Sequence, residues 1–189
     1  MIYPAQLYRD QLQQKLISTW YDPRYKYYYD SSGKNEQTIP DNCYYQRHFA
    51  SVDKYGNVIG YICYTYDDYS SYAKWFGIMC FEGSCCFEFI ADVIRVVDDI
   101  FEKFNLNRIE FDCFSDNPAL ESYRRFIRKY GGEEVARFRK TVKLQDGTWQ
   151  DSIKFEILYD EDIISENNIT RLHKDRLRLD KMFKVGDSK

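Results

Sequence analysis

The stretch FDCFSDNPALESYRRFIRKYGG, residues 111–132, carries side chains whose types and spacing could do chemistry. Asn117 stands in a Ser-Asp-Asn-Pro turn, where an asparagine side chain commonly caps the helix that follows, and Pro118 suits the first helical position. Tyr123 follows on the apolar face of that predicted helix. A tyrosine there can donate a proton, or it can simply be part of the core, and the sequence leaves both roles open.

Three carboxylates are candidates for a general base. Glu110 and Asp112 alternate on one face of the predicted strand RIEFDCF, and Glu82 follows another predicted strand. A carboxylate that lies beside a bound substrate could accept a proton from it. A carboxylate on a strand can equally be a solvent-facing side chain, so this interpretation also stays open.

The six cysteines form no Cys-x-x-Cys pair, and only His48 and His173 could join them in binding a metal. We therefore expect no metal site and mostly reduced, buried thiols. Cys85 and Cys86 are adjacent, but no histidine stands near them in the sequence to activate a thiolate. A covalent acyl-cysteine is accordingly disfavoured.

The elements around these residues follow from periodicity and turn signals. A helix is predicted over 4–20, and residues 22–46 form an irregular segment. The tyrosine-rich stretch WYDPRYKYYYD, residues 20–30, leads into this segment and either covers a core or stacks on a substrate. The pattern then predicts strands over 47–53, 57–67 and 73–81, a helix over 87–104, a strand over 107–114, a helix over 117–130, and a hairpin of 133–144 with 149–159.

This order predicts an α/β (α+β) fold, with a mixed, mostly antiparallel sheet of about six to seven strands and helices on both faces. We assign residues 1–160 to one domain, with residues 1–46 as a variable substrate-side segment. Residues 161–189 form a charged tail with a short helix, because apolar residues recur at helical spacing over 169–183.

Charge and hydropathy exclude several classes of function. The net charge is −3 and the basic residues are spread along the chain, which argues against nucleic-acid binding. No apolar run of 18 residues predicts a membrane span, and the N-terminus lacks a signal-peptide pattern, so we expect a cytoplasmic protein.

Residues 47–160 resemble the GNAT acetyltransferase superfamily in the order of their elements. The resemblance implies transfer of an acetyl group from acetyl-coenzyme A to an amine, with the backbone of Ile78, Met79 and Cys80 pairing with the pantetheine arm. The family's pyrophosphate loop would correspond here to Gly83, Ser84, Cys85, Cys86 and Phe87. The loop departs from the family pattern, since it has one glycine, no Arg or Gln at its start, and acidic Glu82 and Glu88 beside it.

The same resemblance gives roles to the residues of the opening stretch. Asn117 would contact the pantetheine region, and Tyr123 would protonate the departing thiolate. The backbone N–H of Met79 or Cys80 would stabilise the oxyanion. The acceptor would be a small-molecule or peptide amine, and the net acidity favours a cationic one such as a polyamine, an aminoglycoside or a lysine.

Two alternatives follow from the same residues. A catalytically inactive GNAT-fold protein would bind acyl-coenzyme A or a protein partner, as the irregular loop suggests. A self-associating or partner-binding module would use residues 20–45 and the C-terminal helix, and a homodimer is one form that it could take.

Overall fold

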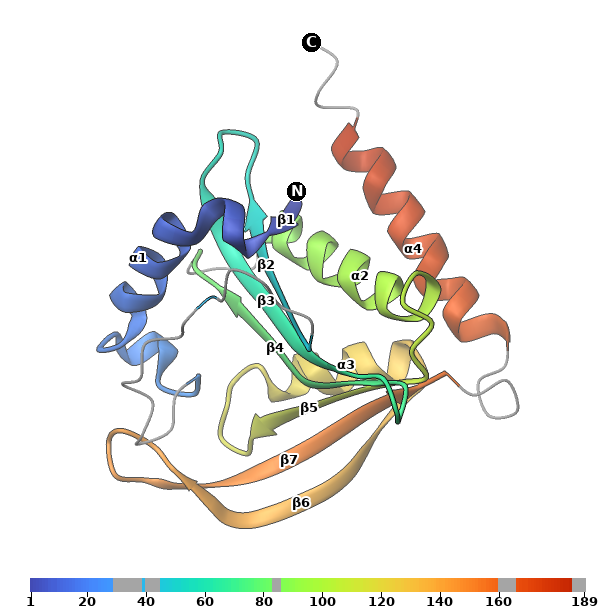
Figure 1. Cartoon of the computed structure of the whole chain (residues 1–189). Helices are drawn as coiled ribbons and strands as arrows, with labels where there is room; N and C mark the ends of the chain where they lie inside the picture. Colours follow the sequence, from blue (N-terminus) through green and yellow to red (C-terminus); the bar gives the residue numbers. More distant parts are fainter. Residues whose placement is uncertain (29–38, 40–44, 83–85, 160–165, 185–189) are drawn as a thin grey trace.

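The computed structural model describes residues 1–28, 39, 45–82, 86–159 and 166–184. Figure 1 shows a twisted sheet with helices packed around it. The strands are β1 (Ile2–Pro4), β2 (Gln46–Val52), β3 (Val58–Asp67), β4 (Tyr72–Cys80), β5 (Arg108–Phe114), β6 (Gly132–Lys143) and β7 (Trp149–Leu158). The helices are η1 (Ala5–Tyr8), α1 (Arg9–Thr19), η2 (Pro23–Tyr25), α2 (Phe87–Glu102), α3 (Leu120–Lys129) and α4 (Glu166–Lys184), where η marks a 3-10 helix.

The strands form one mixed sheet in the order β1-β2-β3-β4-β5-β7-β6. All neighbours are antiparallel except β4 and β5, which are parallel because α2 carries the chain from one to the other. The predicted α/β fold with a mostly antiparallel sheet is therefore confirmed.

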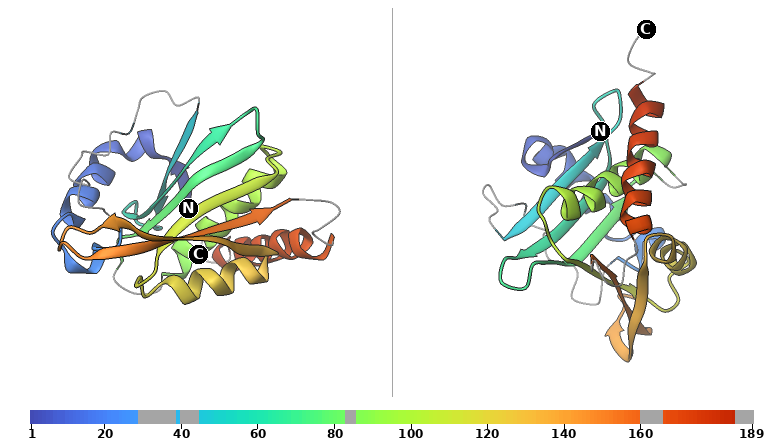
Figure 2. Two further views of the ribbon diagram at one scale, coloured as in Figure 1. Left: turned by 90° about the horizontal axis from the view of Figure 1, so that it is seen from below. Right: turned by 90° about the vertical axis from the view of Figure 1, so that its right-hand side faces the viewer.

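Two hydrophobic clusters cover opposite faces of this sheet. On one face, Leu12 and Leu16 of α1 pack on Tyr61 and Met79. On the other face, the apolar side of α2 and residues of α3 pack on the alternating Ile109, Phe111 and Cys113 of β5. Figure 2 shows α1 separated by the sheet from α2 and α3. Alternation along β5 therefore directs Glu110 and Asp112 to the face on which α1 lies.

The prediction of a helix over 4–20 is wrong at its start. Residues Ile2–Pro4 form the edge strand β1, whose Ile2 pairs with Ser51 of β2, and Ala5–Tyr8 form a 3-10 turn before α1 begins at Arg9. Pairing with β2 gives these residues backbone partners that a first helical turn would leave unpaired. A three-residue edge strand carries too little periodicity to be recognised in a sequence.

The C-terminal helix α4 lies against α2 (Figure 1), and ion pairs with aspartates, one of which is fully buried, hold it there. Arg176 is 2.7 Å from the carboxylate of Asp98, which is fully buried, and 2.5 Å from that of Asp99. Arg95 of α2 in turn reaches Asp180 of α4 at 2.5 Å. With 19 residues, α4 is longer than the short helix that the sequence predicts.

None of the helices among the described residues is long and apolar enough to cross a membrane.

Candidate functional site

The parallel strands β4 and β5 separate soon after they meet. They pair only at Tyr72 with Arg108 and at Ala73 with Ile109. From there β4 stays with β3 up to Cys80, while β5 stays with β7 up to Phe114. The two strands therefore diverge towards their carboxyl ends, as Figure 1 shows. We use the word cleft for the two facing strand edges that no longer pair with each other, on β4 beyond Ala73 and on β5 beyond Ile109.

A bulge in β4 marks the start of this divergence. The register of β3 and β4 shifts between Cys63 and Thr65, so that Trp75 and Phe76 together lie opposite Tyr64. Trp75 has a backbone φ of +54°, in the left-handed region. Bulges of this kind bend a strand and increase its twist, which turns the rest of β4 away from β5.

The hydrogen-bond pattern determines which peptide groups face the cleft. The N–H of Phe81 bonds to Ile59 of β3, so by the alternation of an antiparallel ladder Met79 also bonds back to β3. The peptide groups of Ile78 and Cys80 therefore point into the cleft. Just after β5, the N–H of Ser115 bonds to the backbone oxygen of Asp151 in β7. The same alternation along β5 therefore directs the peptide groups of Asp112 away from β7 and into the cleft.

Tyr123 of α3 lies on the apolar floor of this region. Its ring contacts Phe111 of β5 edge-to-face, with the centroids 5.7 Å apart, and Phe111 contacts Phe76 of the bulge at 6.5 Å. Burial raises the pKa of the Tyr123 hydroxyl well above its ordinary value, and Tyr28 and Cys113 act in the same direction. Burial likewise raises the pKa of Cys113 to about 12. Both groups are therefore protonated and neutral at pH 7.

Asn117 forms a turn just before the start of α3. Its side-chain oxygen accepts a hydrogen bond from the N–H of Ala119 at 2.9 Å, and its backbone oxygen accepts one from Leu120 at 2.9 Å. The regular helix begins at Leu120, two residues later than Pro118. The predicted N-cap role of Asn117 is therefore wrong, because the residue that precedes the first turn of α3 is Ala119 and the helix has no side-chain capping bond. The amide nitrogen of Asn117 has no partner among the described residues.

The loop after β4 leads into α2, and Gly83, Ser84 and Cys85 of the predicted pyrophosphate loop lie outside the described residues. Cys86 precedes the first turn of α2, and Phe87 is exposed. The N–H groups of Phe87, Glu88 and Phe89 have no acceptor among the described residues, as expected for a helix N-terminus. Such groups favour an anion.

A glycine on the sheet determines how this end of α2 sits. A Cβ at Gly60 of β3 would lie 2.2 Å from the ring of Phe89, which is buried. Phe89 therefore packs directly on the strand and is not part of an open loop. The side chains of Lys15, Glu82, Cys86 and Glu88 line a hollow of about 650 Å³ beside this helix end.

The predicted bases occupy two separate places. Glu82 is exposed at the end of β4. Glu110 is ion-paired with Lys154 of β7, which also lies 3.8 Å from Asp112. Because Glu110 alternates with Phe111 along β5, its side chain lies on the opposite face of the sheet from Tyr123.

Two further segments border the cleft. Tyr25 of η2 is buried, and its hydroxyl donates a hydrogen bond to the backbone oxygen of Phe81 at 3.2 Å. Lys26 lies 3.6 Å from Asp146 at the tip of the β6–β7 hairpin. The segment from η2 to Tyr28 thus joins the end of β4 to this hairpin tip.

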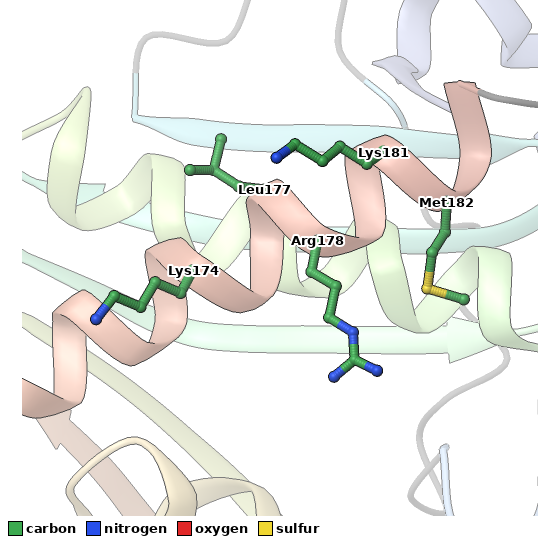
Figure 3. Close-up of a pocket in the computed structure, with 5 residues that line it drawn as sticks. All are labelled: Lys174, Leu177, Arg178, Lys181 and Met182. Carbon is green, nitrogen blue, oxygen red and sulfur yellow. The ribbon is translucent and has the colours of Figure 1, made fainter.

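A hollow on the outer face of α4 lies apart from the cleft. Figure 3 shows its lining residues along the helix: Lys174, Leu177, Arg178, Lys181 and Met182. This surface has no convergent backbone donors, so we do not assign chemistry to it. Within the described part of the chain, no three His, Cys, Asp or Glu side chains are grouped as metal ligands would be.

The sequence did not single out Trp75. Within AKWFGIMCF it reads as one more apolar strand residue, and only its exposure and left-handed backbone distinguish it in the structure. The Lys154 partner of Glu110 was also missed, although alternation along both strands of the pair would have placed it on the same face.

No protein-family model matches the chain, and no curated protein matches it in sequence. Solved structures do match. A mutant of the spermidine N-acetyltransferase SpeG from Vibrio cholerae shares 20% identity at a TM-score of 0.63, covering 85% of this chain and 96% of that chain. SpeG from the same organism in complex with manganese ions shares 24% identity at a TM-score of 0.54, and the match covers 66% of this chain and 70% of that chain. The dodecameric structure of this acetyltransferase in an intermediate state shares 23% identity at a TM-score of 0.55, and the match covers 67% of this chain and 71% of that chain. The chain therefore has the fold of the GNAT-superfamily N-acetyltransferases.

Proposed function

We propose that this protein transfers an acetyl group from acetyl-coenzyme A to a primary amine by direct attack. The observation that carries the proposal is the cleft between β4 and β5, with the half-buried, hydroxyl-bearing ring of Tyr123 packed on Phe111 of β5. A gap in a sheet that leaves peptide groups unpaired is costly unless a ligand or water satisfies them. An extended pantetheine arm, with its own amides, is a suitable ligand for that gap.

The residues present fit acetyl-coenzyme A at both ends of the cleft. The peptide groups of Ile78 would bind the pantetheine arm, and the amide nitrogen of Asn117 would donate to it from the β5 side. The N-terminal amides of α2, with Cys86 and Phe87 at its start, would hold the pyrophosphate. When bound, acetyl-coenzyme A would supply an activated thioester.

Tyr123 would donate a proton to the leaving thiolate, since its raised pKa keeps it protonated across the working range of pH. The N–H of Cys80 or of Ile78, both on the cleft side of β4, would stabilise negative charge on the carbonyl oxygen, whereas the N–H of Met79 bonds to β3. Glu110 or Glu82, acting through water, would accept the proton of the amine.

The acceptor class follows from charge and from the similar structures. SpeG is named as a spermidine N-acetyltransferase, and the α1 face of β5 and β7 carries the carboxylates of Glu110, Asp112 and Glu156. We therefore propose a polyamine or another cationic amine as the acceptor. One similar structure is dodecameric, and self-association of this chain remains a prediction.

A binding protein without turnover is the alternative, and the acidic residues around the end of α2 favour it. Glu82 and Glu88 line the hollow where a pyrophosphate would lie. Nearby negative charge weakens the attraction of a helix N-terminus for an anion.

Calorimetric titration with acetyl-coenzyme A, followed by an amine screen, tests the proposal. We expect binding that weakens when Asn117 becomes Ala, and turnover that is lost in Tyr123→Phe while binding is kept. Glu88→Gln should tighten binding about two- to fivefold, because it removes a charge that opposes the phosphates. Binding without turnover of any amine would support the alternative, and an absence of binding would refute both.

A further inference from the structure

Trp75 combines two features that a strand residue rarely has together. Its side chain is 65% exposed, and its backbone φ of +54° is one that glycine or asparagine adopts more easily. A large aromatic residue in this conformation is strained, and residues of this kind concentrate at functional sites. Nothing in the packing of the sheet requires an indole at this bulge.

The position of Trp75 in the cleft follows from the strand pairing. It lies two residues beyond Ala73, the last residue of β4 that pairs with β5. This step rests on the proposed function: a pantetheine arm that starts at the amides of α2 would run back along β4. From Cys80 to Trp75 is about 16 Å of strand, so the acyl end would reach the bulge. The acceptor amine must approach at that point.

The surroundings of the ring suit a cation. The ammonium of Lys74 lies 5.6 Å from the Trp75 ring and is neutralised by Asp67 at 3.0 Å. An ammonium group within about 6 Å of an indole face is attracted by the ring. The adjoining face of the sheet has more carboxylates than basic groups. The carboxylates are those of Asp67, Glu110, Asp112 and Glu156, and the basic groups are those of Lys74, Arg108 and Lys154.

We propose that Trp75 is a specificity-determining residue, whose ring contacts a second, charged nitrogen of the acceptor while the neutral amine attacks the thioester. The ring would then select acceptors that carry an additional positive charge near the reacting amine. The strained backbone at the bulge is what directs the indole out of the sheet and into the path of the acceptor.

Calorimetry with spermidine, in the presence of coenzyme A, tests the contact without requiring turnover. We expect Trp75→Ala to weaken spermidine binding about five- to thirtyfold, and Trp75→Phe to restore part of the loss. Trp149→Ala is the matched control, because Trp149 is also exposed, at 56%, but lies at the start of β7. In that variant the affinity should stay unchanged.

Steady-state kinetics distinguish the proposed role of Trp75 in acceptor recognition from the proposed acetyl transfer itself. In Trp75→Ala, KM for spermidine should rise while kcat and acetyl-coenzyme A affinity stay constant, and KM for a neutral-chain amine of similar length should not move. Equal losses for both amines, or equal losses in Trp149→Ala, would overturn the proposal. If no variant acetylates any amine but spermidine binding still depends on Trp75, the proposed function fails and the recognition role stands.

The backbone gives an independent readout. Trp75→Gly and Trp75→Ala both remove the ring, but only glycine relieves the left-handed strain, so the Tm of the glycine variant should be about 2–4 °C higher. Equal Tm values would show that the backbone at the bulge is not strained, and would contradict the proposal that the strained backbone directs the indole towards the acceptor.

Discussion

Tyr123 has the two properties that a proton donor to a thiolate needs, a position by the cleft and a hydroxyl that stays protonated. We expect Tyr123→Phe to lower kcat at least about 100-fold, which is the lower range for loss of a general acid. Acetyl-coenzyme A affinity should stay constant, because the phenyl ring keeps the contact with Phe111. Rapid-quench kinetics and calorimetry would measure the two quantities; a kcat within threefold of the parent would rule out the role.

The pH profile gives a second test at the same residue. Because burial disfavours the phenolate, the pKa of Tyr123 lies above its ordinary value of about 10. Activity should therefore rise with pH as the acceptor loses its proton, and loss of the Tyr123 proton should not lower it below about pH 10. A descending limb near pH 8 that disappears in Tyr123→Phe would contradict this assignment.

At the scale of elements, the contact of Gly60 with Phe89 determines where α2 presents its N-terminus. Gly60→Ala places a methyl group against a buried ring, so we expect a loss of about 1–3 kcal/mol in the free energy of unfolding and weaker acetyl-coenzyme A binding. Adding Phe89→Leu should restore part of both. Urea denaturation and calorimetry would measure these effects, and an unchanged affinity would separate the contact from the cofactor site.

The docking of α4 depends on charge. Arg176→Ala would leave the buried carboxylate of Asp98 without its strongest partner, because His173 is farther away at 3.3 Å. The expected cost is about 3–5 kcal/mol. Arg178→Ala is the control, since Arg178 lies on the outer face shown in Figure 3 and should change stability by less than about 0.5 kcal/mol. Equal denaturation midpoints for the two variants would contradict the role of the buried pair.

Periodicity predicted the elements that have a strong pattern of their own. The apolar stripe of α2, the Asp-Gly turn of the β6–β7 hairpin and the glycine after α3 each rest on local chemistry, and Gly131 and Gly147 do have positive φ. The turn at Asn117 is also local, but the helix after it begins two residues later than the sequence predicts, with Ala119 as its N-cap.

The features that long-range pairing creates were not predictable in the same way. β1 exists because β2 offers it an edge, and the bulge at Trp75 depends on the register with β3. The assignment of cleft-facing amides requires that register too, which is why Met79 and Cys80 could not be distinguished from the sequence.

At the scale of the whole molecule, acetyl-coenzyme A would connect two parts of the sheet that barely touch. At 100 times its Kd, such a ligand stabilises the folded state by about 2.7 kcal/mol, which corresponds to a rise in Tm of about 5–11 °C for a chain of this size. Differential scanning calorimetry would measure this shift. Desulfo-coenzyme A should give a similar rise and adenosine alone a smaller one; equal rises would mean that the pantetheine arm does not bind in the cleft.

The brevity of the contact between β4 and β5 also has a mechanical consequence. The β4–β5 strand pairing joins β1–β4 to β5–β7 through only two residue pairs, which lie at one corner of the sheet. A rotation of these two halves of the sheet about Ala73 and Ile109 would therefore break no other hydrogen bonds between paired strands. The ion pair between Lys26 and Asp146 connects η2 to the tip of the β6–β7 hairpin. Both of its side chains are exposed, so it adds little to the stability of that connection. Resistance to a change in the width of the opening therefore comes mainly from the apolar core that α2 shares with both halves of the sheet, and not from the strand ladder.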